Sequence, residues 1–391
     1  MRLETQKFIP FAAPDIGDAE IAAVVECLRS GWLTTGLKTK EFERLFAEFV
    51  GVKHALAVNS CTAALHLALE AYGVGPGDKV LTTPFTFTAT AETVRYLGAD
   101  PVFADIDPHT MNIDPVSAER VLQSDVNFKA LLPVHYAGLP CDMNALGGLA
   151  EKYDLKVIED AAHALPCSYK GRAAGSLGDV GAFSFYATKT LCTGEGGMVT
   201  TDDDSIAERI RTMRLHGISR DVFDRYQSEK PSWYYEVVAP GFKYNMPDTA
   251  AAMGIEQLSR AKLLRERRQS IADYYNSQFS GLPIDLPPAA ATGDEHAWHL
   301  YVIRLQGINP RRDEFIQALA DRGVGASVHF IPLHVQPYWR ERYQLKPDDF
   351  PVAYDVYRRC VSLPIYTKMS DADVERVADS VKLVLASFEQ N

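Results

Sequence analysis

The feature that most constrains the fold is an alternation of short apolar segments and helical patterns between residues 54 and 202. Seven segments there have the length and composition of strands: 54–59, 79–84, 101–106, 129–135, 156–160, 181–185 and 196–201. Residues 62–72 and 91–98, which lie between strands, carry apolar side chains at helical spacing. Strands that alternate with helices predict an α/β fold with a mostly parallel, doubly wound sheet.

The rest of the chain has a different pattern. Residues 217–240 lack periodicity and predict a long loop, and helical spacing returns from Pro247. Two strand candidates, HAWHLYVIRL (296–305) and VGASVHFIPL (324–333), then alternate with helices. We therefore expect a large α/β domain at 1–250, with a helical segment at its N-terminus. A helical connector and a small α+β domain follow at 251–391.

Charge and composition exclude several classes. The formal net charge of −11 argues against nucleic acid or an anionic membrane surface as the main partner. The six scattered cysteines form no C-x-x-C pair, so we expect buried thiols, no disulfide framework and no metal site. The N-terminal residues lack a signal pattern, and the chain has no apolar run of about 18 residues. We expect a cytoplasmic protein.

One lysine stands where a solvated charge is unusual. Lys189 lies in FSFYATKTLCTGEGG (183–197), between aromatic residues and a glycine-rich turn. Burial lowers the pKa of a lysine, and such an amine can attack an aldehyde. Ser184 is placed to contact a phosphate, and the glycines let the backbone pass close to a bulky group. The alternative is a surface lysine in a turn.

Two further segments follow predicted strands, at the ends where open α/β sheets bind ligands. The strand 156–160 ends in Asp160, which either meets a ligand or caps a helix. The segment NSCTAAL (59–65) opens an apolar helix, whose N-terminal N–H groups can bind phosphate. Simple capping by Asn59, Ser60 or Thr62 is the alternative there.

Together, these segments meet the needs of pyridoxal 5'-phosphate (PLP). That cofactor requires a lysine for a Schiff base, a carboxylate on its pyridinium nitrogen and an anion site. The carboxylate keeps the ring nitrogen protonated, so that the ring can accept the electrons of a carbanion. Phe87, at the end of another predicted strand, is placed to stack on the ring. We interpret the chain as a PLP enzyme.

At these residues the chain resembles the DegT/DnrJ/StrS-type nucleotide-sugar aminotransferases, over about residues 8–385. The order and spacing of nine segments carry the resemblance: SGWLTTG (30–36), NSCTAALHLAL (59–69), TPFTFTATAE (83–92), DIDPHTMNID (105–114), PVHYAG (133–138), IEDAAHA (158–164), FSFYATKTLCTGEGG (183–197), GFKYNMPDTAAAMGIEQL (241–258) and VHFIPLH (328–334). It implies the fold-type I PLP architecture, with a mostly parallel central sheet and a smaller C-terminal α+β domain.

The resemblance also implies roles for single residues. Lys189 would bind the cofactor as a Schiff base and then move the proton between substrate and cofactor. Asp160 would pair with the pyridine nitrogen, and His163 would stand beside the ring hydroxyl; a core histidine is the alternative for His163. Asn245 would reach the phosphate bound by a neighbouring subunit, which implies a homodimer with shared active sites. The phosphate would be held by Ser60, Cys61, Thr62 and Ser184.

Two positions, Cys61 and Asn245, depart from the family pattern. The family often has glycine where Cys61 stands, and a cysteine would be strained there if the backbone needed a positive φ. If Cys61 is the first helical residue, it is acceptable. The family often has arginine in the position of Asn245. Some relatives replace the lysine with histidine and act as dehydrases, so Lys189 favours transamination.

The resemblance is closest to enzymes that aminate C4 of UDP-4-keto sugars, with glutamate as donor. Our first choice of substrate is the 4-keto pentose, which gives UDP-4-amino-4-deoxy-L-arabinose for a lipopolysaccharide or another cell-surface polysaccharide. UDP-4-keto-6-deoxy-N-acetylhexosamines and GDP-4-keto-6-deoxymannose are the alternatives. Candidate sugar contacts are Trp32, Thr34, Arg220 and His329. A core histidine is the alternative for His329.

Two other functions compete with the aminotransferase. One is a catalytically silent relative that binds PLP or a nucleotide sugar and regulates transcription or scaffolds a partner. The other is a PLP dehydrase. The chain keeps both Lys189 and Asp160 and carries no basic tail, which argues for transamination.

Overall fold

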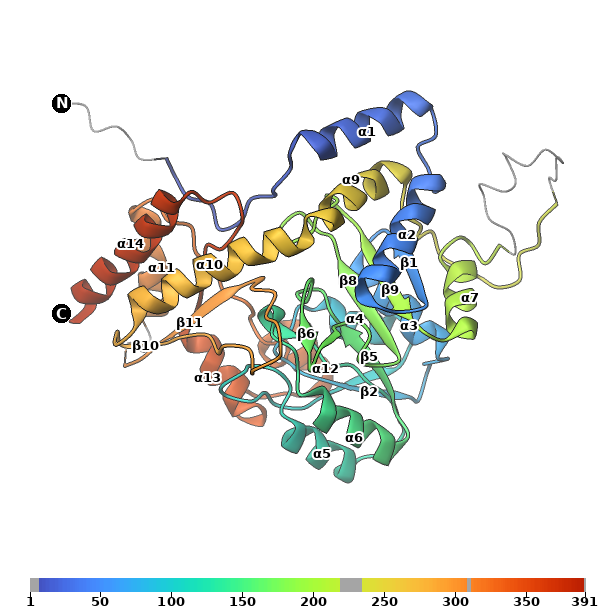
Figure 1. The fold of residues 1–391 in the computed structure, drawn as a ribbon. Helices are drawn as coiled ribbons and strands as arrows, with labels where there is room; N and C mark the ends of the chain where they lie inside the picture. Colours follow the sequence, from blue (N-terminus) through green and yellow to red (C-terminus); the bar gives the residue numbers. More distant parts are fainter. Residues whose placement is uncertain (1–6, 219–233, 308–310, 390–391) are drawn as a thin grey trace.

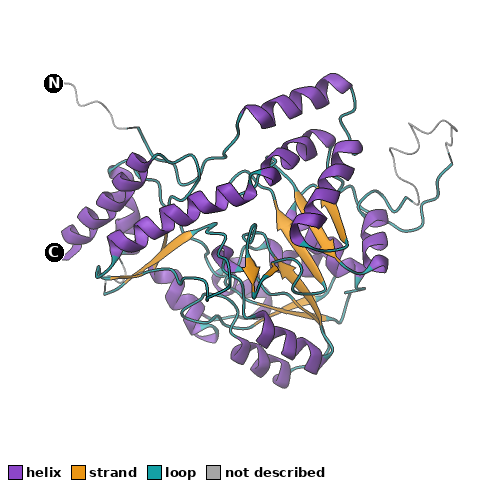
Figure 2. Ribbon diagram, viewed as in Figure 1, coloured by secondary structure: helices purple, strands orange, loops and turns teal. Residues whose placement is uncertain are grey.

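The chain is described here from a computed structural model, which covers residues 7–218, 234–307 and 311–389. Its centre is a seven-stranded sheet with the order β1-β9-β8-β5-β4-β2-β3 (Figures 1 and 2). The strands are β1 (His54–Val58), β2 (Lys79–Thr82), β3 (Asp100–Phe103), β4 (Phe128–Leu131), β5 (Lys156–Asp160), β8 (Val180–Ser184) and β9 (Gly197–Thr201). All seven predicted strands therefore form one sheet.

The sheet is mostly parallel, as predicted. β3, β2, β4, β5 and β8 pair in parallel, whereas β9 runs antiparallel to both of its neighbours, β8 and β1. The predicted strand 129–135 ends early at Leu131, two residues before Pro133, which lacks the N–H that a strand donates. The mostly parallel α/β sheet predicted from the sequence is confirmed.

Side chains of the sheet alternate between two apolar layers, because successive residues of a strand point to opposite faces. In β1, Leu56 and Val58 pack on the side of α3 (Cys61–Ala71), α4 (Ala89–Tyr96) and α7 (Asp204–Met213). Ala55 and Ala57 pack on the side of α2 (Leu37–Val50) and α9 (Asp248–Ser259). The second side is completed below β4 and β5 by α5 (Pro115–Ser124) and α6 (Met143–Tyr153).

Capping side chains begin several of these helices. Asp114 accepts hydrogen bonds from the N–H groups of Val116 and Ser117 at the start of α5, and Pro115 provides the first helical residue. Asp142 and Asp203 cap α6 and α7 in the same way. Short polar side chains before the apolar helical patterns therefore set these boundaries.

The C-terminal part forms a separate three-stranded sheet of β10 (Ile284–Asp285), β11 (Tyr301–Leu305) and β12 (Cys360–Leu363). The connector predicted from Pro247 is two successive helices, α9 and α10 (Ala261–Phe279), which run towards the C-terminal helices in Figure 1. The division at residue 250 stays a prediction. The remaining elements are α1 (Asp18–Ser30), β6 (Ser168–Tyr169), β7 (Arg172–Ala173), α11 (Arg312–Asp321), α12 (Pro337–Tyr343), α13 (Pro351–Arg359) and α14 (Asp371–Glu389).

The prediction of a strand at 324–333 is wrong. This segment makes one antiparallel pair with β12, in which Ser327 and Ser362 exchange backbone hydrogen bonds of 3.1 and 2.8 Å. The segment then leaves the sheet, and Val328 to Leu333 line cavities. Val324 packs in the core of the C-terminal part, whereas Val328, Phe330, Ile331 and Leu333 line the cavities. The apolar pattern therefore combines two environments and does not mark a continuous strand. The predicted strand at 296–305 is confirmed over Tyr301–Leu305.

The six cysteines, all within the described residues, are free thiols, and five of them are buried. No helix among the described residues is both long and apolar enough to span a membrane. The predicted long loop at 217–240 falls mostly on residues 219–233, outside the described residues.

Candidate functional site

A cavity of about 490 Å³ opens at the carboxyl ends of β1, β2, β5 and β8. Parallel strands bring these ends to one edge of the sheet, where α/β folds bind ligands. Nine of the predicted site residues line the cavity: Ser60, Cys61, Thr62, Phe87, Asp160, His163, Ser184, Lys189 and His329. Segments that are far apart in the sequence therefore meet at one site.

Lys189 lies in the turn that joins β8 to β9. The N–H of Lys189 donates to the carbonyl of Tyr186 (2.9 Å). Further along the turn, the N–H of Thr193 donates to the carbonyl of Phe185 (2.9 Å). The side chain is half-buried, and burial lowers the pKa of its amine to about 8. The lysine therefore lies in the cavity and not on a solvated turn.

Asp160 ends β5 with a buried carboxylate. Its Oδ2 accepts a hydrogen bond from the hydroxyl of Thr90 (2.8 Å), and its Oδ1 accepts one from the N–H of Ala162 (3.1 Å). Burial raises the pKa of Asp160, while these two donors and the nearby Lys189 oppose the rise. No helix begins after Asp160, so the capping alternative is wrong.

The N-terminus of α3 forms the floor of the cavity below Lys189. Ser60 is the N-cap, and its hydroxyl accepts a hydrogen bond from the N–H of Ala63 (3.1 Å). Cys61 is the first helical residue and is not among the described residues with a positive φ, so cysteine is unstrained there. The N–H groups of Cys61 and Thr62 are among those that a helix leaves without an internal partner.

A glycine brings β9 against this helix terminus. A Cβ atom at Gly197 would lie 2.5 Å from the backbone carbon of Ser60 and 2.8 Å from the nitrogen of Cys61. Real contacts of that length do not occur, so only glycine fits. The glycine-rich segment thus lets the backbone pass close to another group, as predicted, and that group is the backbone of Ser60.

Two predicted histidines, His163 and His329, also line the cavity. Nδ1 of His163 accepts a hydrogen bond from the N–H of Ala137 (3.3 Å), and its ring stacks on Phe330 at 5.8 Å. Burial holds the pKa of His163 well below its usual range, so the imidazole is neutral. His329 lies 2.9 Å from the hydroxyl of Ser362 through Nδ1, and burial lowers its pKa to about 4.

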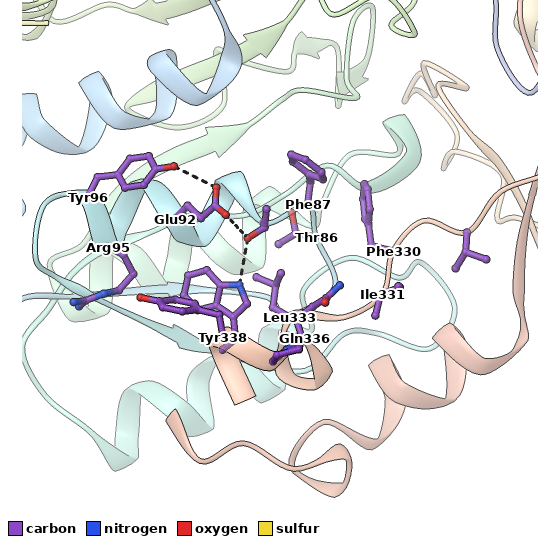
Figure 3. Close-up of a pocket in the computed structure, with 14 residues that line it drawn as sticks. Thr86, Phe87, Glu92, Arg95, Tyr96, Phe330, Ile331, Leu333, Gln336 and Tyr338 are labelled. Carbon is purple, nitrogen blue, oxygen red and sulfur yellow. Dashed lines mark hydrogen bonds between the residues drawn. The ribbon is translucent and has the colours of Figure 1, made fainter. Parts of the chain in front are cut away.

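Phe87 stands between this cavity and a larger one. Its side chain is 60% exposed, and its ring centroid lies 6.1 Å from that of Phe330. Both residues and Thr86 also line an adjoining cavity of about 920 Å³, shown in Figure 3. Aromatic rings and a network of Thr88, Glu92, Tyr96 and Trp339 make up part of its wall.

Three predicted residues lie away from the Lys189 cavity of their own chain. Asn245 donates through Nδ2 to the hydroxyl of Thr35 (2.7 Å), and Trp32 donates through Nε1 to the carbonyl of Thr35 (3.2 Å). Thr34 is exposed, and its carbonyl accepts a hydrogen bond from the N–H of Asp248 (3.3 Å). Arg220 lies outside the described residues.

Among the cavity residues that sequence reasoning missed, three make contacts with predicted site residues: Thr90, His299 and Phe330. Thr90 lies three residues after Phe87, in the first turn of α4, and its hydroxyl donates to Asp160. His299 lies in HAWHLYVIRL, whose apolar pattern indicates a strand. That pattern gave no reason to expect a cavity-lining side chain at this position. Phe330 directly follows His329 and stacks on His163. A polar residue close to a predicted strand end was the available signal for the first two.

The cavity fits PLP on three observations. It presents an amine whose pKa is lowered into the range of a nucleophile, and a buried carboxylate that two donors favour in its ionised form. It also contains the N-terminus of an 11-residue helix, where anions bind. Among the described residues, no group of side chains could hold a metal ion.

Comparisons with known proteins agree with this chemistry. Residues 14–382 match the DegT/DnrJ/EryC1/StrS aminotransferase family. The spore coat polysaccharide biosynthesis protein SpsC of Bacillus subtilis is 50% identical over 378 residues, which is 96% of each chain.

Solved structures are similar along the whole chain. Spr1654 of Streptococcus pneumoniae, named as a sugar aminotransferase, was solved with pyridoxamine phosphate. It has a TM-score of 0.91 and 35% identity over 97% of this chain and 100% of that chain. It was also solved in a PLP form. PseC of Helicobacter pylori, an aminotransferase of pseudoaminic acid biosynthesis, has a TM-score of 0.90 and 30% identity over 98% and 100%.

The chain therefore belongs to the DegT/DnrJ/EryC1/StrS aminotransferase family, and it is a PLP-dependent aminotransferase that acts on a sugar.

Proposed function

We propose that the protein transfers an amino group from glutamate to C4 of a UDP-4-keto sugar. The first candidate is UDP-4-keto-pentose, with UDP-4-amino-4-deoxy-L-arabinose as the product. The observation that carries the proposal is that the amine of Lys189 and the carboxylate of Asp160 share one cavity at the sheet edge. The choice of sugar rests on the combination of four segments: PVHYAG (133–138), LHGISRD (215–221), GFKYNM (241–246) and SVHFIPLH (327–334). The first and the last contribute Val134 and His329 to the wall of that cavity.

PLP, when bound, supplies an aldehyde and a ring that takes up the electrons released at the substrate carbon. Lys189 would hold that aldehyde and would then move the proton, for which an amine with a pKa of about 8 is suited at neutral pH. Asp160 would pair with the ring nitrogen and keep it protonated, and the hydroxyl of Thr90 donates to that carboxylate and orients it. His163, a neutral imidazole, would stand beside the ring hydroxyl, and Phe87 would stack on the ring.

The N-terminus of α3 is our candidate for the phosphate site. Cys61 and Thr62 offer backbone N–H groups there, and the hydroxyls of Ser60 and Ser184 face the same cavity. A helix N-terminus also carries a partial positive charge, which favours the phosphate. These contacts need no cation.

We also propose a homodimer with shared active sites. Asn245, Trp32 and Thr34 lie together around Thr35, away from the cavity of their own chain. Leu33 and Leu37 expose apolar side chains beside them. This arrangement supports a role of the three residues in the site of a second subunit, where Asn245 reaches the phosphate. Arg220 and His329 complete the proposed sugar contacts.

The test uses purified protein that has been loaded with PLP. UDP-4-amino-4-deoxy-L-arabinose is added to one sample and glutamate to another, and the visible absorption of the bound cofactor is followed. Bleaching by both compounds supports the pentose. Bleaching by glutamate alone supports glutamate as the amino donor and contradicts the pentose as the sugar substrate. The Lys189→Ala variant serves as control, because it should lose both the visible band and turnover.

A second sugar class is favoured by one comparison. PseC of Helicobacter pylori acts in the biosynthesis of pseudoaminic acid, which supports the UDP-4-keto-6-deoxy-N-acetylhexosamines as the next substrates to test. A missing methyl group changes binding by only about 1–3 kcal/mol, so overlap between the two sugars is expected. GDP-4-keto-6-deoxymannose is the third sugar substrate to test.

The name of the Bacillus subtilis relative supports a role of the product in a surface polysaccharide. We propose the cytoplasm as the compartment, where sugar nucleotides are made. Release of ammonia from the sugar without a continuing supply of donor would instead indicate a dehydrase. A cofactor band that no amino donor bleaches would indicate a silent binding protein.

A further inference from the structure

The amine of Lys189 is met by a side chain from the C-terminal part of the chain. Nζ of Lys189 lies 3.4 Å from Nε2 of His299, although 110 residues separate them. His299 precedes β11, and its carbonyl accepts a hydrogen bond from Nη1 of the buried Arg268 in α10 (3.3 Å). The turn between β8 and β9, which carries Lys189, therefore contacts the segment that leads into β11 of the three-stranded sheet.

His299 has an unusual surrounding for a buried histidine. Its Nδ1 is buried and has no hydrogen-bond partner among the described residues. Its ring lies 4.3 Å from the ring of His163. Burial, with Lys189 next to it, holds the pKa of His299 well below its usual range, so the imidazole is neutral. An unpartnered buried nitrogen lowers stability, so its retention calls for a functional reason.

Other charged and titratable groups face Lys189 without binding its amine. They are Cys61 of α3, Asp160 of β5, His163 of the following turn, Arg268 of α10 and His329 of the 324–333 segment. Among the described residues, His299 provides the side-chain nitrogen or oxygen that lies within hydrogen-bond distance of Nζ. A neutral imidazole has one acceptor nitrogen, and an ammonium group has donors only.

We propose that His299 is a positioning residue, whose Nε2 accepts a hydrogen bond from the free amine of Lys189 whenever that amine is not covalently bound to the cofactor. The contact holds the amine in the cavity, ready for the proton transfer that the proposed function assigns to it. The inference rests on that function for its purpose, but the contact can be tested without any turnover.

Removal of the acceptor should disfavour the charged amine. In His299→Phe the ammonium form of Lys189 loses its hydrogen bond while the cavity stays apolar. The amine should therefore lose its proton at a lower pH. His299→Asn keeps an acceptor oxygen and should restore part of the effect. The matched control is His296→Phe, because His296 is also buried and stacks on Trp298 but does not line the cavity.

The experiment uses the full-length protein freed of cofactor. The protein is pulse-labelled by reductive methylation over a range of pH, and methylation of Lys189 is quantified by mass spectrometry. In the wild type the midpoint should lie at about pH 8. In His299→Phe it should fall by about one pH unit, a tenfold loss of proton affinity. In His296→Phe it should not move.

An unchanged midpoint in His299→Phe, or an equal shift in His296→Phe, overturns the proposal. Circular dichroism checks folding, and His299→Leu replaces the phenylalanine variant if that variant does not fold. Failure of the proposed function is recognised separately, by a Lys189→Ala variant that keeps turnover.

Discussion

Oδ2 of Asp160 accepts a 2.8 Å hydrogen bond from the hydroxyl of Thr90, although 70 residues separate the two. The donor favours the ionised carboxylate in a buried site, where desolvation favours the neutral acid. In Thr90→Val the pKa of Asp160 should rise further, and the affinity for PLP should fall by about tenfold, as expected for a hydrogen bond to a charged group. Equilibrium titration of the cofactor measures the change.

Thr93→Val is the matched control for that variant. Thr93 is buried on the same helix, but its hydroxyl donates to the carbonyl of Thr90 (3.3 Å) and not to the carboxylate. Its affinity for PLP should equal that of the wild type. Equal losses in both variants would show that packing of α4, and not the bond to Asp160, matters for the cofactor.

The lowered pKa of Lys189 predicts how stability depends on pH. An unfolded lysine has a pKa of about 10.4, and burial lowers that of folded Lys189 to about 8. Between these values the unfolded state binds more protons, so the folded state loses stability as the pH falls. Lys189→Met should therefore stabilise the cofactor-free protein at pH 7, and the gain should vanish above about pH 10.4.

Urea denaturation at pH 7 and pH 10.5 measures this effect. The buffer alone changes the stability of every variant, so the comparison is the difference from the wild type at each pH. A methionine variant that gains equally at both values would point to better packing and contradict a desolvated amine.

Ser60 is expected to combine two roles. Its hydroxyl caps α3 through the N–H of Ala63, and Ser60→Ala should cost about 1 kcal/mol of unfolding free energy. If the hydroxyl also holds the phosphate, the variant should release PLP more readily. Asp114→Ala removes the N-cap of α5, away from the cavity, and should cost a similar stability without a change in PLP affinity.

A mixing experiment tests the shared site. Lys189→Ala and Asn245→Ala homodimers should each have low activity. Subunit exchange should restore activity, because one site of the mixed dimer then combines Lys189 of one chain with Asn245 of the other. Activity that stays low after confirmed exchange would contradict the proposed sharing. Mass spectrometry of the intact dimers checks that the exchange took place.

The sequence predicted best what depends on local pattern. The sheet strands follow from apolar segments of the right length, and α3 begins where its capping serine stands. Whether cysteine is strained at position 61 depends on the φ angle of that residue, which the sequence alone does not specify. The structure shows that φ is not positive there. The segment 324–333 was misread because apolar side chains of the core and of the cavity walls together resemble the pattern of a buried strand.

Contacts between distant segments were less predictable. Thr90 and His299 reach the site only because the topology brings α4 and the start of β11 to the edge of the large sheet. The sequence around Asn245 does not indicate whether its side chain contributes to the cavity of its own chain or, as we propose, to that of a second subunit. Such residues become visible once the tertiary arrangement is known, whereas strand ends and helix caps can be read directly.

The position of β9 determines the order in which the site can assemble during folding. β8 and β9 pair across the connection 185–196, with Ser184 opposite Gly197, so the hairpin that carries Lys189 needs only contacts that are close in the sequence. β1 reaches β9 by pairing His54 with Thr201, which closes a loop of well over a hundred residues. Long-range pairings of this kind form late. The lysine hairpin should thus form before the N-terminus of α3 docks against it, and the cofactor should bind tightly only after the long-range pairing of β1 with β9 has formed.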